Sequence, residues 1–62
     1  MSDYKIITVT SKDPEVAASE MEFKVDCWEQ DGYSTSGGVS ATTTNDDGET
    51  KIVLTQAMVK DD

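Results

Sequence analysis

The side chains that could do chemistry in this chain are few, and they do not form a catalytic set. Cys27 is the one thiol, and the chain has no histidine to act as its general base near neutral pH. One cysteine without histidine also cannot supply the four ligands of a structural zinc site. We therefore predict no catalytic residue, no metal site and no cofactor, and we interpret Cys27 as a packed or interfacial thiol.

Two groups of carboxylates are the next candidates. Glu22 and Asp26 are spaced by one helical turn, and Asp46, Asp47 and Glu49 surround a turn. The second group lacks the alternating acids that a calcium-binding loop spreads over about twelve residues. Solvated acidic surface is the simpler interpretation of both groups, and we expect that the protein is not an enzyme.

The glycine-rich segment over residues 32–40 is the third candidate, because it could bind a ligand through its backbone. The adjacent pair Gly37-Gly38 indicates a bulge, a sharp bend or a close approach to the backbone. Backbone N–H groups around such a pair can form a concave anion site. A small ligand is therefore a candidate for this loop. The predicted binding residues are Tyr33, Gly37, Gly38 and Ser40.

Four elements must position these residues, and their order predicts an α+β fold. Segments rich in β-branched residues predict strands, and apolar residues at helical spacing predict one helix. We predict one βαββ domain over residues 1–62, with a strand over 4–11, a helix over 14–30, strands over 34–44 and 49–60, and an acidic tail at 61–62. The helix packs on one face of a three-stranded sheet. We expect the first two strands to be parallel. The third strand should run antiparallel to both. We expect it to lie between them rather than at the edge of the sheet, because it carries more large apolar side chains than the second strand.

Local signals predict where the helix and the hairpin turn begin and end. Asp13 is a suitable N-cap, and Pro14 is favourable at the first helical position. Gly32 can take the positive φ that ends a helix. Asp47-Gly48 supplies the positive φ angles of a hairpin turn.

A helical wheel of residues 14–30 has two apolar stripes. The wider stripe should pack on the sheet and contains Ala17, Ala18, Met21, Val25 and Trp28. The narrower stripe contains Val16, Phe23 and Cys27. It is either exposed or a contact for a subunit or partner, and the small core favours a contact.

The last strand has apolar side chains on both faces, but a single helix can cover only one face of the sheet. The other face needs a second copy or a partner, or it stays partly exposed. The candidate interface residues on this strand are Ile52, Leu54 and Met58. A chain of 62 residues without a disulfide has a marginal core, so we predict a homo-oligomer, with a two-fold dimer favoured.

The charge balance restricts the partners. The chain has 13 acids, five lysines and no arginine, for a net charge of −8. We therefore expect no direct nucleic-acid binding, and either a basic partner or an acidic surface that only keeps the protein soluble. No apolar run approaches the length of a membrane span, and the lone thiol and the absence of a signal-peptide pattern predict a cytoplasmic protein without a membrane partner.

Four segments together carry a resemblance to a known family. They are Tyr4-Lys5-Ile6-Ile7, Gly32-Tyr33, Gly37-Gly38-Val39-Ser40 and Gln56-Ala57-Met58-Val59. In this order and spacing they resemble a short family of bacterial and viral proteins of unknown function. The chain departs from the family in having tyrosine at position 33 where tryptophan is usual, and Ser36 where leucine is common; its tryptophan is Trp28. The resemblance implies a small α+β domain of phage type, acting in the host cytoplasm, and implies no activity.

These observations favour a small acidic interaction protein that oligomerises and inhibits or sequesters a cytosolic target, such as a defence protein of the host. One alternative is a sponge that binds a nucleotide-like signalling ligand at the Gly37-Gly38 loop. Another is a DNA mimic whose carboxylates occupy a basic cleft, supported by the acidic row on the back of the helix.

Overall fold

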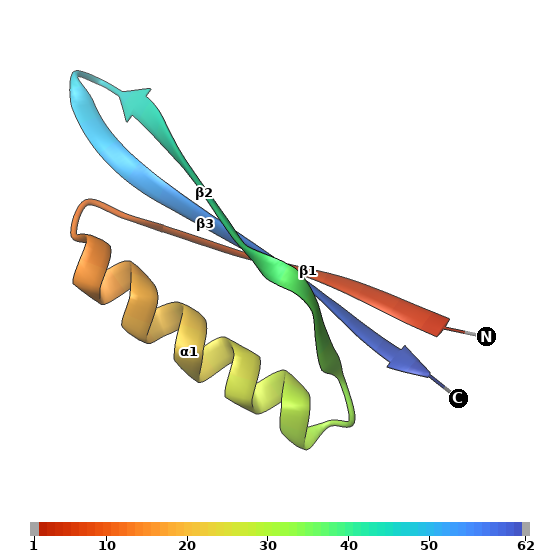
Figure 1. Cartoon of the computed structure of the whole chain (residues 1–62). Helices are drawn as coiled ribbons and strands as arrows, with labels where there is room; N and C mark the ends of the chain where they lie inside the picture. The colour runs from red at the N-terminus through yellow and green to blue at the C-terminus, as the bar shows by residue number, and fades with distance from the viewer. Residues whose placement is uncertain (1, 62) are drawn as a thin grey trace.

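The computed structural model describes residues 2–61 and contains the four predicted elements. They are β1 (Ser2–Ser11), α1 (Pro14–Gln30), β2 (Ser34–Asp46) and β3 (Glu49–Asp61) (Figure 1). Each strand is one or two residues longer than predicted, and the helix has the predicted bounds. Within the described residues, no helix is long and apolar enough to cross a membrane.

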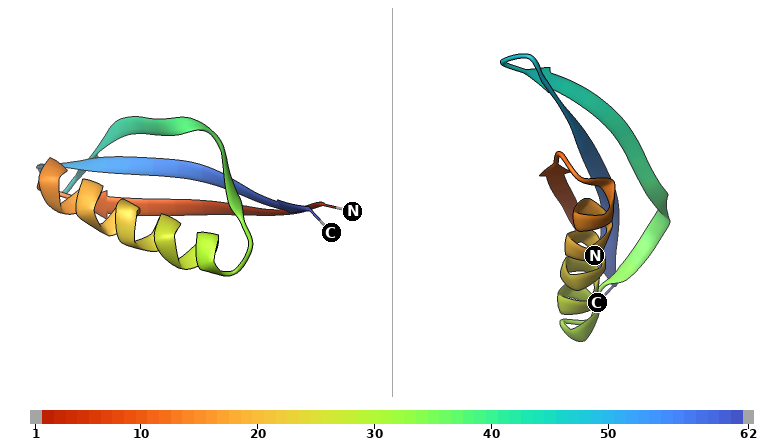
Figure 2. Two further views of the ribbon diagram at one scale, coloured as in Figure 1. Left: turned by 60° about the horizontal axis from the view of Figure 1, so that its bottom comes forward. Right: turned by 90° about the vertical axis from the view of Figure 1, so that its left-hand side faces the viewer.

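The strand order confirms the predicted topology. The sheet runs β1-β3-β2, and β3 is antiparallel to both neighbours, so β1 and β2 are parallel to each other. The helix lies along one face of the sheet, mainly over β1 and β3, while β2 arches away from it (Figure 2). The two ends of the chain meet at one end of the molecule, where Ser2 pairs with Asp61.

The N-terminus of α1 is capped as predicted. Asp13 has an extended backbone, and its carboxylate accepts a hydrogen bond of 2.9 Å from the N–H of Glu15. Pro14 occupies the first helical position, where its missing N–H costs no helical hydrogen bond. Lys12, just before the cap, forms a 3.1 Å ion pair with Glu49 at the start of β3.

The C-terminus of α1 is a Schellman motif. Gly32 has φ +94°, and its N–H donates to the carbonyl of Glu29 at 3.0 Å. The N–H of Tyr33 donates to the carbonyl of Trp28 at 3.1 Å. The side chains of Trp28 and Tyr33 also meet, with ring centroids 5.3 Å apart in an edge-on arrangement. This contact directs the chain from the helix into β2.

Two lysines cover this aromatic pair. The Nζ of Lys5 lies 5.1 Å from the centre of the Trp28 ring, and the Nζ of Lys60 lies 5.6 Å from the centre of the Tyr33 ring. Both distances are typical of cation–π contacts. These two lysines therefore connect β1 and β3 to the end of the helix.

The β2–β3 turn has the predicted geometry. Asp47 and Gly48 both have positive φ, at 51° and 79°, as a two-residue type I′ turn requires. The flanking residues Asp46 and Glu49 are paired across the strands.

The core lies between α1 and the facing side of β1 and β3. Its buried members are Ile7, Val9, Ala17, Met21 and Met58, and the partly buried Val25, Trp28, Tyr33 and Leu54 pack against them. The wider helical stripe therefore faces the sheet as predicted, except that Ala18 is exposed. Ala18 lies at the edge of the stripe, on the side where β2 arches away.

The opposite side of the sheet, which we call the open face, is not covered by α1. Tyr4 and Ile6 are 69% and 63% exposed on it. Strand alternation and the pairing register place these side chains on the open face between the charged strand ends: Tyr4, Ile6, Thr8, Thr10, Val53, Thr55, Ala57, Val59, Ser34, Ser36, Ser40, Thr42 and Thr44. The charged side chains that the same alternation places on this face, Asp46, Glu49, Lys51 and Asp61, lie toward its two ends, so its middle is uncharged.

Candidate functional site

A bulge in β2 is the main irregularity of the sheet. Ser36 pairs with Ala57 and Ser40 pairs with Thr55, so the three residues 37–39 lie opposite Gln56 alone. The extra residues bend β2 away from its partner strand. The structure thus confirms a bulge at the glycine pair.

The side chain of Gln56 is built into this bulge. It is 3% exposed, and its Nε2 donates to the carbonyl oxygens of Gly37 at 3.2 Å and Ala57 at 2.8 Å. These bonds replace part of the ladder that the bulge interrupts, because a buried carbonyl without a partner would be costly. Two segments of the sequence motif, Gly37-Gly38 and Gln56-Ala57, therefore contact each other in the fold.

The two glycines of the bulge differ, and this leads to a prediction. Gly37 has φ +77°, whereas Gly38 does not have a positive φ, and a Cβ added at either position meets no atom within 4 Å. We expect Gly37→Ala to lower the free energy of unfolding by about 1 kcal/mol through backbone strain alone. Gly38→Ala should leave it unchanged or raise it slightly. Urea unfolding of both variants measures the difference, and equal costs would contradict it.

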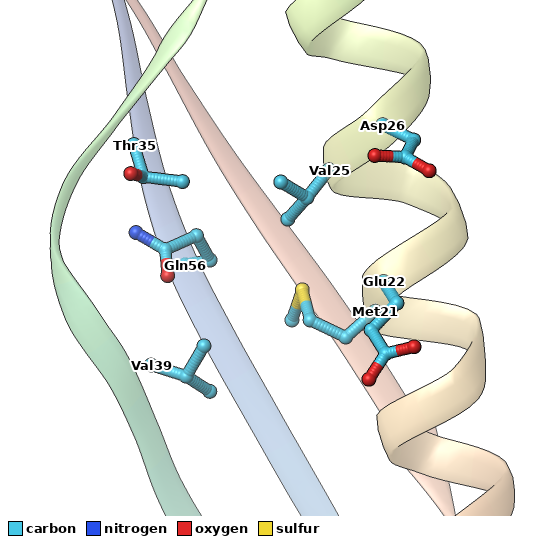
Figure 3. Close-up of a pocket in the computed structure, with 7 residues that line it drawn as sticks. All are labelled: Met21, Glu22, Val25, Asp26, Thr35, Val39 and Gln56. Carbon is cyan, nitrogen blue, oxygen red and sulfur yellow. The ribbon is translucent and has the colours of Figure 1, made fainter.

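The bulge opens a groove between α1 and β2, with a volume of ≈ 390 Å³. Its lining residues are Met21, Glu22, Val25, Asp26, Thr35, Val39 and Gln56. Figure 3 shows the side chains of Met21, Val25 and Val39 facing the space between the two elements, with Gln56 on β3 behind them. The groove therefore has an apolar lining with carboxylates on its helical side, a combination that suits a ligand with an apolar part and a polar end.

The predicted loop residues do not converge on this groove. Tyr33 is half-buried against Trp28, and Ser40 is an exposed residue of the open face. Gly37 contributes a carbonyl that is already bonded to Gln56. Since Glu22 and Asp26 lie at the groove, its electrostatics oppose a phosphorylated ligand, and the backbone near the glycines is an unfavourable anion site.

Sequence reasoning missed the groove because its residues come from three elements. One signal was available in the pattern of β3. Ile52, Leu54, Gln56 and Met58 alternate along one face, and an amide in such an apolar series indicates a polar group that must be satisfied inside the protein. Two of its acceptors, the carbonyls of Ser36 and Gly37, precede it by 20 and 19 residues.

The residues predicted for an interface fall into two groups. Phe23 and Val16 are 70% and 45% exposed, and Cys27 is exposed, so this stripe is accessible on α1. The prediction for β3 needs correction. Met58 is fully buried by the chain itself, Leu54 packs against the same core, and Ile52 lies on their face of the strand. The helix covers that face, so these three residues do not line the uncovered surface.

The acids of the helix lie beside the exposed stripe. Seven acids and one lysine occur from Asp13 to Asp31. At 100° per residue, four exposed acids form a row along α1 between the groove and Phe23. We call it the acidic row; its members are Glu15, Glu22, Asp26 and Glu29. The surface of α1 therefore combines a large apolar side chain with a dense negative charge.

Comparison of the chain with protein-family models, curated proteins and solved structures finds no match. The resemblance to the short bacterial and viral family therefore stays a prediction. Within this chain, the hydrogen bond from Gln56 to Gly37 brings two of the four segments into contact.

Proposed function

We propose that the protein is a small, acidic, non-enzymatic binding protein that self-associates through its open face. In this proposal, α1 captures a basic protein of the host cytosol, such as a defence protein, and thereby inhibits or sequesters it. The observation that carries the proposal is the exposure of Phe23 beside the acidic row. Exposed aromatic side chains are frequent anchors of protein interfaces, and surrounding charges determine which partner docks and how fast.

The open face supports the self-association. Its middle is uncharged while the chain as a whole has a net charge of −8, so two copies can stack there without placing acids against each other. The remaining repulsion acts over distance and is screened beyond about 8 Å at physiological salt.

A cross-linking experiment tests the helical surface. The chain carries a photoreactive phenylalanine at position 23 or, as a control, at the exposed position 50, which lies outside both the open face and α1, and it is irradiated in host lysate. We expect the probe at position 23 to capture a basic protein that the control does not. Excess unlabelled wild type should prevent capture, whereas excess Phe23→Ser should not.

The affinity of the captured protein for wild type and for variants of Phe23 then tests the proposal. In calorimetry with the purified partner, Phe23→Ser should weaken binding roughly 30-fold, the effect of removing an interface anchor. The matched change Val16→Ser removes a smaller, less exposed side chain and should have a smaller effect. Failure to capture a basic protein, or full competition by Phe23→Ser, would overturn the proposal.

A DNA mimic is the second candidate, and the acidic row favours it. Such a protein would bind a nucleic-acid-binding cleft mainly through Glu15, Glu22, Asp26 and Glu29. Double-stranded DNA should then displace it from the partner, the affinity should fall steeply with salt, and Phe23→Ser should bind as wild type does.

A further inference from the structure

We propose that the groove between α1 and β2 binds an arginine side chain of the basic partner. This inference rests on the proposed function and names the chemistry that one part of the surface would recognise. Three properties of the groove carry it: its apolar lining, the unpaired amide oxygen of a lining residue, and two carboxylates on the helix.

The apolar lining suits the stem of a long side chain. Met21 is buried, and its side chain points with those of Val25 and Val39 into the space between α1 and β2 (Figure 3). The volume of ≈ 390 Å³ accommodates a side chain but not a folded segment. Long cationic side chains commonly place their methylene stem on such a surface and keep the charged head at its rim.

Gln56 supplies an unused acceptor. Its Nε2 makes the hydrogen bonds to the bulge, but its Oε1 has no hydrogen-bond partner within residues 2–61. Gln56 lines the groove, and this oxygen is not completely enclosed, although the residue as a whole is 3% exposed. An amide oxygen accepts N–H groups, which both arginine and lysine carry.

The negative charge at the groove favours a cationic side chain, and the arrangement of its acceptors favours arginine over lysine. Glu22 and Asp26 are one helical turn apart on the same side of α1, and both line the groove. A guanidinium has five N–H donors in a planar fork, so it can donate to an amide oxygen and to a carboxylate at once. It is also less strongly hydrated than an ammonium, which favours its entry into a partly apolar groove.

The test uses a minimal probe and its neutral isostere. N-acetyl-arginine-N-methylamide is titrated into the isotopically labelled protein, and NMR follows the methyl groups of Met21, Val25 and Val39 and the side-chain amide of Gln56. We expect saturable shift changes confined to these groups. The corresponding citrulline derivative, which has the same shape without charge, should cause none, and the lysine derivative should bind more weakly.

Matched variants distinguish the groove from general charge attraction. Glu22→Gln combined with Asp26→Asn should weaken the arginine probe roughly tenfold, as expected for the loss of two partly exposed ion pairs. Asp3→Asn combined with Glu20→Gln removes the same charge outside the groove and should have little effect. Val39→Trp should fill the groove and abolish the shifts, and Val39 is half-exposed, so the fold should tolerate it.

Two results would overturn the inference: equal binding of the citrulline and arginine probes, or equal weakening by the two double variants. Either result would leave the proposed function intact if Phe23 still anchors a basic partner. Conversely, arginine binding in the groove without any partner captured at position 23 would support the subsite and contradict the proposed function.

Discussion

Replacement of Met58 by alanine is expected to lower the free energy of unfolding by about 2–5 kcal/mol. Met58 is 0% exposed and lies in the core cluster with Ile7, Val9 and Met21, so alanine removes apolar contacts and leaves a cavity. A single core in a domain of this size supplies at most about 3–5 kcal/mol. Most of the variant should therefore be unfolded at 25 °C, and urea titration followed by circular dichroism measures the loss.

Phe23→Ala is the matched control for this prediction. Phenylalanine is larger than methionine, but Phe23 is 70% exposed on α1, and alanine is the better helix former. We expect a change below about 0.5 kcal/mol, in either direction. If Met58→Ala lowered the free energy of unfolding only slightly, the face of β3 that is turned to the helix would not be the core.

Self-association through the open face is the second large effect. We expect wild type to be a dimer at micromolar concentration and Ile6→Asp to be a monomer. Each copy loses one buried isoleucine, worth about 1.5–3 kcal/mol, so the dissociation constant should rise on the order of 10²–10⁴-fold. Ile6 is 63% exposed in the isolated chain, so the substitution should not unfold it. Sedimentation equilibrium measures the dissociation constant.

Phe23→Asp places the same new charge on the helix and controls for net charge. It should stay dimeric, because Phe23 lies on the side of the molecule opposite the open face. If Phe23→Asp dissociates the dimer and Ile6→Asp does not, the helical stripe is the subunit contact. A monomeric wild type would contradict self-association altogether.

Much of the fold was predictable because its signals are local. Asp13-Pro14 starts the helix and Gly32 ends it through hydrogen bonds and φ angles set within a few residues. Asp47-Gly48 likewise forms its turn from its own backbone preferences. The central place of β3 was predictable from its apolar content, since a middle strand contacts more of the core than an edge strand does.

The binding surfaces were only partly predictable. The sequence identified the narrower helical stripe, and the structure exposes all three of its members, with Phe23 70% exposed. It also predicted a loop site at Tyr33, Gly37, Gly38 and Ser40. In the structure Tyr33 packs against Trp28, Ser40 lies on the open face, and the Gly37 carbonyl accepts from Gln56. No local pattern shows that Gln56 lies opposite the glycine bulge, because strand pairing sets that register.

The sequence by itself determined which elements form, where they begin and end, and which side chains share a face. Only the tertiary structure decided which face of β3 the helix covers. Both faces carry apolar residues, Leu54 and Met58 on one and Val53 and Val59 on the other. The alternation of side chains along the strand therefore does not indicate which face is buried. The helix packs on the face of Met58, where Ala17 and Met21 join the buried core. This arrangement leaves the other face, with its uncharged middle, open and leaves a groove beside the bulge.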